Sequence, residues 1–215
     1  MSIPRRVRLT SIIISFALAG CAAQPMSFLG ASFPRVEYKD IKKRAAPLRL
    51  KLVVEFQRNG EDFPKGDIPL RDYAAAILNE TGVISTYDVV TEAEKQEEGQ
   101  IRIIVNNVAD SATVAAEESG PKLPRWMVGK TITDAYEMSL FITTRGKTIS
   151  RTGIKHAFHT VIGNMEIPDG IQTFPSDQAF GRMVRQMILH ALEDMQKTGE
   201  LSQLNAPGAL AFSSL

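Results

Sequence analysis

The sequence predicts an α+β fold, in which two helices cover one face of a mainly antiparallel sheet that contains a long hairpin. Three patterns lead to this prediction. Apolar and polar residues alternate over 48–56, two β-prone segments flank Arg145-Gly146, and an apolar stripe recurs at helical spacing over 180–195. The 215 residues, 44% hydrophobic and 23% charged, suffice for one domain with its own core.

The domain is expected to begin with a strand and a helix. The alternation over 48–56 is typical of a half-buried strand, which Asn59-Gly60 ends with turn chemistry. Pro69 can open a helix, and Gly82 can close it. The apolar residues at helical spacing between them are Leu70, Tyr73, Ala74, Ile77 and Leu78.

Four further strands are predicted in the middle of the chain. Two short ones are expected at 83–90 and 100–108, separated by an acidic run at 91–98 that is typical of a solvated turn or a short helix. Two long ones follow at 131–144 and 147–162. A two-residue connection joins the long strands, so they are expected to form one hairpin.

The last helix has the clearest pattern. Ser176 can cap its start and Gly199 its end. His190 faces away from the apolar stripe and is expected to contact solvent. The stripe comprises Phe180, Met183, Val184, Met187, Ile188, Ala191, Leu192 and Met195. Its three methionines are expected to pack in the core, the alternative being a soft-metal or peptide-binding face.

The N-terminus has the form of an export signal. Three arginines, Arg5, Arg6 and Arg8, precede an apolar stretch at 9–19. That stretch is shorter than the roughly 20 residues that span a bilayer, and it fits the hydrophobic region of a secretory signal, about 7–15 residues long. Removal of residues 1–20 leaves acidic side chains in slight excess, so nucleic acid is not an expected partner.

The only cysteine of the chain follows this signal directly. The tetrad Leu18-Ala19-Gly20-Cys21 resembles the lipobox of bacterial lipoproteins. The resemblance implies cleavage between Gly20 and Cys21, a lipid on the Cys21 thiol and acylation of the new amine. Two or three such chains hold a protein stably on a membrane surface that it does not span. The alternative is an incidental cysteine at the end of a signal peptide, and in either case no intrachain disulfide can form.

Residues beyond the lipobox suggest where the protein resides. In Gram-negative lipoproteins an aspartate after the acylated cysteine commonly retains the protein at the inner membrane, and here that residue is Ala22. The resemblance therefore implies the outer membrane, with the folded part in the periplasm. We expect a tether at 21–46, one domain at 47–200 and a tail at 201–215. The basic cluster at 42–44 fits a solvated linker or attraction to anionic headgroups.

A loop with unusual bulk is predicted between the strands at 100–108 and 131–144. It contains the single tryptophan, Trp126, together with Leu123 and Met127. Loops of compact domains are usually polar, whereas an amphipathic indole can anchor an interface. Trp126, Met127 and Leu123 are therefore candidate partner-binding residues, with a lid over the core as the alternative.

His156 and His159 are the remaining candidates for chemistry. A metal site would need both imidazoles to converge with a third ligand such as Glu166 or Asp169. Residues three apart diverge on a strand, and 147–162 is predicted to be one. The sequence therefore predicts neither a metal nor another cofactor.

The order of elements resembles that of small periplasmic lipoproteins that accompany envelope assembly machines, the CsgG-like and LpoB-like group. The resemblance and the lipobox favour a non-enzymatic lipoprotein that binds an envelope protein partner. One alternative is an oligomeric pore or secretion-channel component, motivated by the length of the hairpin at 131–162. A second alternative is a metal-dependent envelope hydrolase that uses His156 and His159.

Overall fold

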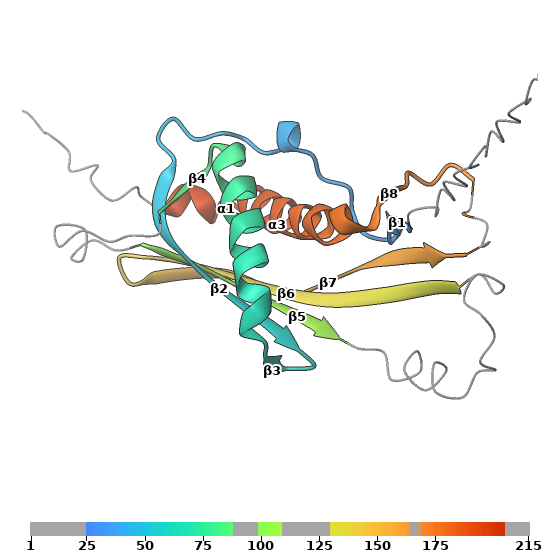
Figure 1. The fold of residues 1–215 in the computed structure, drawn as a ribbon. Helices are drawn as coiled ribbons and strands as arrows, with labels where there is room; N and C mark the ends of the chain where they lie inside the picture. Colours follow the sequence, from blue (N-terminus) through green and yellow to red (C-terminus); the bar gives the residue numbers. More distant parts are fainter. Residues whose placement is uncertain (1–24, 88–98, 109–129, 164–166, 168, 205–215) are drawn as a thin grey trace, which may run out of the picture.

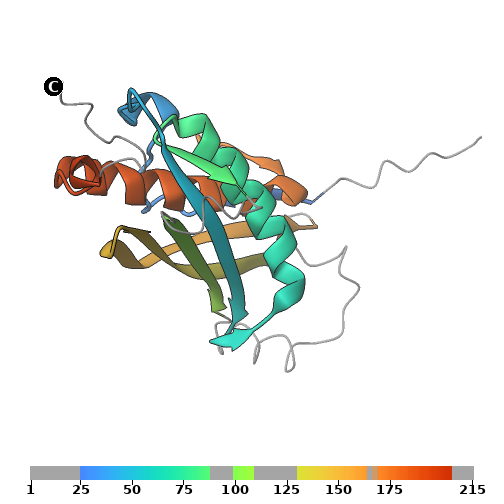
Figure 2. The ribbon, with the colours of Figure 1, turned by 90° about the vertical axis from the view of Figure 1, so that its left-hand side faces the viewer.

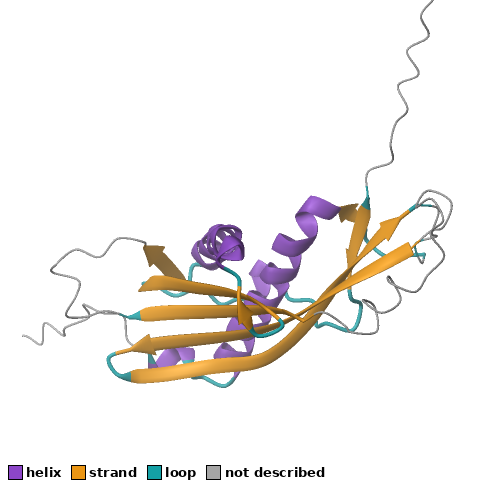
Figure 3. Ribbon diagram, turned by 60° about the horizontal axis from the view of Figure 1, so that its bottom comes forward, coloured by secondary structure: helices purple, strands orange, loops and turns teal. Residues whose placement is uncertain are grey.

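The computed structural model describes residues 25–87, 99–108, 130–163, 167 and 169–204. It confirms the predicted α+β class, with an eight-stranded, mostly antiparallel sheet and two helices on one of its faces (Figures 1 and 3). No helix in the described part of the chain is long and apolar enough to cross a membrane. The strands are β1 (Met26–Leu29), β2 (Leu48–Arg58), β3 (Glu61–Asp62), β4 (Ile84–Tyr87), β5 (Gln100–Val108), β6 (Lys130–Thr144), β7 (Lys147–Ile162) and β8 (Phe174–Pro175).

The sheet runs in the order β3-β2-β5-β6-β7-β1-β8, and β4 pairs with the first residues of β2, at the other end of that strand from β3. Strand β2 is parallel to β4 and β5, and every other pairing is antiparallel. The long helices are α1 (Asp67–Thr81) and α3 (Ala179–Lys197). Short 3₁₀ turns are η1 (Tyr38–Asp40), η2 (Pro64–Gly66), η3 (Ser176–Gln178) and η4 (Leu201–Gln203).

The core lies between the helices and the sheet face beneath them. The two helices run across one another over that face (Figure 2). They approach closely at Gly181, where an added Cβ would lie 2.5 Å from the Tyr73 ring. The predicted alternation holds in β2, where the inward side chains are buried except for the half-buried Val54, and β6 alternates in the same way from Tyr136 onward. Met183, Met187 and Met195 are fully buried, which confirms core packing for the methionines of α3.

The predicted hairpin is confirmed as β6 and β7. Arg145 and Gly146 both adopt positive φ, 48° and 76°, the conformation that lets a two-residue turn match the twist of its strands. The hairpin is an integral part of the sheet, because β6 also pairs with β5 and β7 with β1. Its buried residues, among them Met138, Leu140 and Ile149, belong to the same core cluster as the buried face of α3.

The helix ends agree only partly with the prediction. Gly82 closes α1 with φ 66°, and Gly199 follows the last residues of α3 with φ 75°. The predicted cap at Ser176 is wrong, since η3 precedes α3 there and the Ser176 hydroxyl donates to the Pro25 carbonyl instead. Pro69 lies inside the first turn of α1, which begins at Asp67.

The tether predicted at 21–46 is corrected by the structure, because residues 25–46 are part of the fold. Strand β1 is hydrogen-bonded between β7 and β8, and Val36 and Ile41 are each only 3% exposed. Composition indicated a linker because the segment contains prolines and glycine, but its partners lie far away in sequence. The Val36 N–H, for example, donates to Gln186 Oε1 at 3.1 Å.

The predicted tail also begins too early. Leu201 and Leu204 are buried in the core, and their carbonyl oxygens accept hydrogen bonds from the Arg44 guanidinium at 2.8 and 2.9 Å. The folded part therefore extends from residue 25 to residue 204 at least.

Candidate functional site

Two neighbouring cavities lie beside the segment that follows β1. The smaller one is also lined by β1, β7, β8 and the first half of α3, and the larger one by β5, β6 and β7. Their volumes are about 260 and 460 Å³. Gly30, Phe33 and His156 line both of them. We call this region the Phe33 site.

The centre of the Phe33 site is a group of three rings. Phe33, in the segment after β1, stacks on His156 of β7 with ring centroids 4.0 Å apart and planes 16° apart. His190 of α3 lies edge to face with Phe33, with ring centroids 5.3 Å apart and an angle of 74° between the ring planes. His190 was predicted to face solvent, but it is half-buried and its Nδ1 is inaccessible, because Phe33 from the segment that was expected to be a tether packs against it.

Burial controls the ionisation of His156. Its side chain lies among the buried residues at 6% exposure, and this desolvation lowers its pKa to about 4, with a smaller contribution from the charge of His159. The ring is therefore neutral at neutral pH. His156 Nε2 and His190 Nδ1 are both buried, and neither has a hydrogen-bond partner in the described part of the chain.

His159 does not diverge from His156 as predicted: it lines the larger cavity together with His156, and a Cβ added at Gly30 would lie 3.9 Å from His159 Nε2 and from His156 Nδ1. His159 Nδ1 shares a hydrogen bond with the Thr133 hydroxyl at 2.9 Å, and its ring lies 4.9 Å from that of Phe28. Burial lowers its pKa as well. Over the described ranges no three metal-ligating side chains gather, and Asp169 is exposed. Glu166, the other proposed third ligand, lies outside those ranges.

The larger cavity adds a phenol and an ion pair to the site. Burial, followed by the charge of Asp134, raises the pKa of Tyr136 well above its usual range, so the phenol keeps its proton. Lys155 Nζ and Glu137 Oε2 lie 3.9 Å apart on the lining. The site thus offers neutral hydrogen-bonding groups and aromatic faces, which are the features of a binding pocket.

The smaller cavity contains residues that the sequence did not single out. They are Phe33, which was placed in the expected tether, and the arginines Arg35, Arg182 and Arg185. The two arginines of α3 could have been noticed in the sequence, because Arg182 and Arg185 are three residues apart and therefore share one face of the predicted helix. The residues predicted from the lipobox and the tryptophan loop, Gly20, Cys21, Leu123, Trp126 and Met127, lie outside the described part of the chain.

No protein-family model matches this chain, and no curated protein matches its sequence. Among solved structures it is similar to a PelC variant dodecamer from Paraburkholderia phytofirmans, with 14% identity over 79% of this chain and 97% of that chain and a TM-score of 0.31. A second PelC dodecamer has 12% identity over 78% and 96% of the two chains and a TM-score of 0.30. A putative neuraminyllactose-binding hemagglutinin homologue from Helicobacter pylori has 9% identity over 83% and 92% and a TM-score of 0.31. Similarities this low carry no statement about function.

Proposed function

We propose that this chain is an outer-membrane lipoprotein, anchored through Cys21, whose periplasmic part is a non-enzymatic module that binds an envelope protein. The lipobox Leu18-Ala19-Gly20-Cys21 supports the anchor, and Ala22 supports the outer membrane. The Phe33 site supports a binding role for the folded part. The loop around Trp126 remains a second candidate contact.

The observation that carries the binding role is the pair of unpartnered nitrogens beside Phe33. His156 Nε2 and His190 Nδ1 are both buried without a hydrogen bond within the described residues. A buried polar atom left in this state costs about 1–3 kcal/mol. His156 lines both cavities, so a partner that places a polar group beside its ring would recover part of that free energy.

The same geometry favours binding over acid–base catalysis. A general base works best when its pKa lies near the operating pH, and the pKa of His156 is far below it. Stacking on Phe33 holds the ring in one plane, and no hydrogen bond from another described side chain orients it. A fixed neutral ring suits recognition of a partner.

The proposal is tested with a photo-crosslinking amino acid at position 33 in cells that express the full chain. We expect a defined adduct with an envelope protein, and we expect Cys21→Ser to abolish both the adduct and recovery in the outer-membrane fraction. The adduct is identified by mass spectrometry, which also measures the lipid on Cys21. A matched probe at Tyr73, which is 38% exposed on α1 and outside both cavities, serves as the control.

An unmodified Cys21 thiol would contradict the anchor. Equal adducts from positions 33 and 73, or none from position 33, would contradict the binding role of the Phe33 site. Trp126→Ala separates the two candidate contacts, because it weakens the adduct only if the tryptophan loop takes part.

A further inference from the structure

The smaller cavity of the Phe33 site combines an apolar floor with a basic rim. Its volume is about 260 Å³, near the lower end for small-molecule pockets, which begin at about 300 Å³. The floor is formed by Leu29, Phe33, Ile171 and Phe174. Such a space fits one small molecule with a flat apolar part.

The basic rim consists of Arg35, Arg182 and Arg185, and no described residue of the lining is acidic. Arg35 contacts Glu37 at 3.5 Å, but that carboxylate also binds Lys39 at 2.8 Å. Neither Arg182 nor Arg185 has a carboxylate within 4.0 Å anywhere in the described ranges. Among the described residues, the rim therefore carries a surplus of positive charge.

Arg182 is held in place by neutral contacts that leave its charge available. Its guanidinium lies over the Phe174 ring, 4.7 Å from the centroid. Its Nε and Nη2 donate to Gln178 Oε1 at 3.3 and 3.0 Å. Arg185 lies one helical turn further along α3, and both side chains are half-buried. Pre-positioned guanidinium groups lose little conformational entropy when they bind a ligand.

Guanidinium groups next to an apolar wall select anions. They donate two parallel hydrogen bonds to a carboxylate or phosphate, and the low dielectric of the wall strengthens the attraction. His156 also lines this cavity, and because its ring is neutral it can bond the ligand without repelling or neutralising the charge.

We infer that this cavity binds a small organic anion, with its carboxylate or phosphate on Arg182 and Arg185 and its apolar part against Phe33 and Phe174. The inference rests on the proposed binding role of the Phe33 site. It does not depend on the lipid anchor or on a protein partner, so purified protein can test it alone.

The experiment is a calorimetric titration of the purified, acylated full chain in detergent with phenyl phosphate. Phenol and inorganic phosphate are titrated beside it, to separate the contributions of the ring and the charge. The variants are Arg185→Gln, Arg182→Gln and the double substitution. Arg71→Gln on α1 is the matched control, because it removes the same charge from an exposed side chain outside both cavities.

We expect phenyl phosphate to bind more tightly than phenol or inorganic phosphate, and more weakly as the salt concentration rises. Each single variant should lose about tenfold in affinity, and Arg71→Gln should bind like the wild type. Arg185→Gln is the decisive variant, since Arg185 makes no side-chain hydrogen bond to any described residue whose loss could disturb the fold.

Three outcomes overturn the inference. The first is no binding of phenyl phosphate up to about 10 mM, and the second is equal affinity in the wild type and Arg185→Gln. The third is weaker attachment of Arg185→Gln than of the wild type to phosphatidylglycerol vesicles, with no binding of phenyl phosphate by either protein; because both carry the same acyl chains, this would assign the arginines to lipid headgroups. If crosslinking from position 33 succeeds while the titration fails, only the anionic ligand is excluded and the proposed function stands.

Discussion

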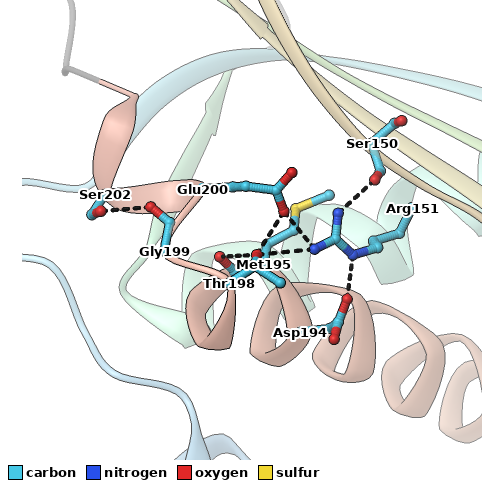
Figure 4. Close-up of polar contacts among 8 residues, drawn as sticks. All are labelled: Ser150, Arg151, Asp194, Met195, Thr198, Gly199, Glu200 and Ser202. Carbon is cyan, nitrogen blue, oxygen red and sulfur yellow. Dashed lines mark hydrogen bonds and ion pairs between the residues drawn. The ribbon is translucent and has the colours of Figure 1, made fainter.

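The two ends of α3 place arginines in opposite electrostatic settings. Near the C-terminal end, Arg151 of β7 is surrounded by acceptors: it pairs with Asp194 of α3 and with Glu200 just beyond it (Figure 4). Its Nη1 donates to the Ser150 carbonyl at 2.8 Å, and its Nη2 donates to the Thr198 hydroxyl at 3.1 Å. Near the N-terminal end, Arg182 and Arg185 face a cavity without a carboxylate within 4.0 Å in the described ranges.

This difference separates a structural use of arginine from a functional one. In the Arg151 network the guanidinium bonds to both carboxylates, so it joins β7 to the end of α3 and leaves no unpaired positive charge for an anionic ligand. The cavity end retains unneutralised charge and unpartnered nitrogens, both of which cost stability unless a ligand is bound. Substitutions at the two ends should therefore affect different properties.

The largest effect should come from acidification, which acts on the cavity end first. Unfolded His156 titrates near 6.5 and the folded side chain near 4, so between these values the unfolded state binds more protons. Its contribution to stability is complete above pH 6.5 and is lost as the pH falls toward 4. The free energy of unfolding, from urea titrations at a series of pH values, should fall by up to about 3 kcal/mol.

The network end should lose stability at a lower pH than the cavity end, so a pH series can distinguish the effects of the two ends. Hydrogen bonding to Arg151 lowers the pKa of Glu200 from its usual 4.5. The stabilisation from this ion pair is therefore complete above pH 4.5, and it is lost only as the pH falls through the pKa of Glu200 in the folded state. His156→Phe keeps a ring against Phe33 but cannot take a proton. If the free energy of unfolding of this variant falls as steeply between pH 6.5 and 4 as that of the wild type, His156 is not the source of the pH dependence.

The second effect is loss of the Arg151 network. Arg151→Ala should lower the free energy of unfolding by about 2 kcal/mol, since it leaves two carboxylates without their partner. The cost stays below the about 3–5 kcal/mol of a fully buried pair, because Asp194 and Glu200 are 47% and 34% exposed. Urea denaturation measures the change, and affinity for phenyl phosphate should not alter.

Lys197→Ala is the matched control for Arg151→Ala. Lys197 pairs with Glu193 at 2.8 Å but is 66% exposed, so its loss should change stability by no more than about 0.5 kcal/mol. Equal effects of the two substitutions would mean that Arg151 does not join β7 to α3.

The sequence predicts β6, β7 and α3 but not the Phe33 site, for a physical reason. Local patterns decide β6, β7 and α3, because side-chain alternation and helical periodicity reflect burial on one face. The Phe33 site depends on contacts between residues far apart in sequence, such as the stack of Phe33 on His156. No periodicity marks Phe33, and the prolines around it resemble those of a linker.

The parallel pairing of β2 with β5 illustrates the same limit. The sequence predicts both strands correctly, but their periodicity does not tell which strands become neighbours in the sheet. In the site, the spacing of Arg182 and Arg185 is visible in the sequence, whereas the absence of acidic partners within the described residues is a property of the fold.

The smallest change in stability is expected from substitution of the two glutamines that hold residues 36–42 against α3, and it should differ between them. At the cavity end, buried Gln186 accepts the Val36 N–H at 3.1 Å. At the network end, Gln196 accepts the Lys42 N–H at 2.9 Å and donates to its carbonyl oxygen at 2.6 Å, but these bonds are exposed. Water can replace the Gln196 bonds and cannot reach Val36 as easily.

Gln186→Leu should therefore cost about 1 kcal/mol, and Gln196→Leu should cost less than half of that, although it removes two hydrogen bonds. Amide hydrogen exchange tests whether the lost hydrogen bond is the cause. In Gln186→Leu the Val36 N–H should exchange faster than in the wild type, while the exchange rate of the Lys42 N–H should change little. A larger destabilisation by Gln196→Leu would contradict the expectation that burial, and not the number of hydrogen bonds, holds this segment in the fold.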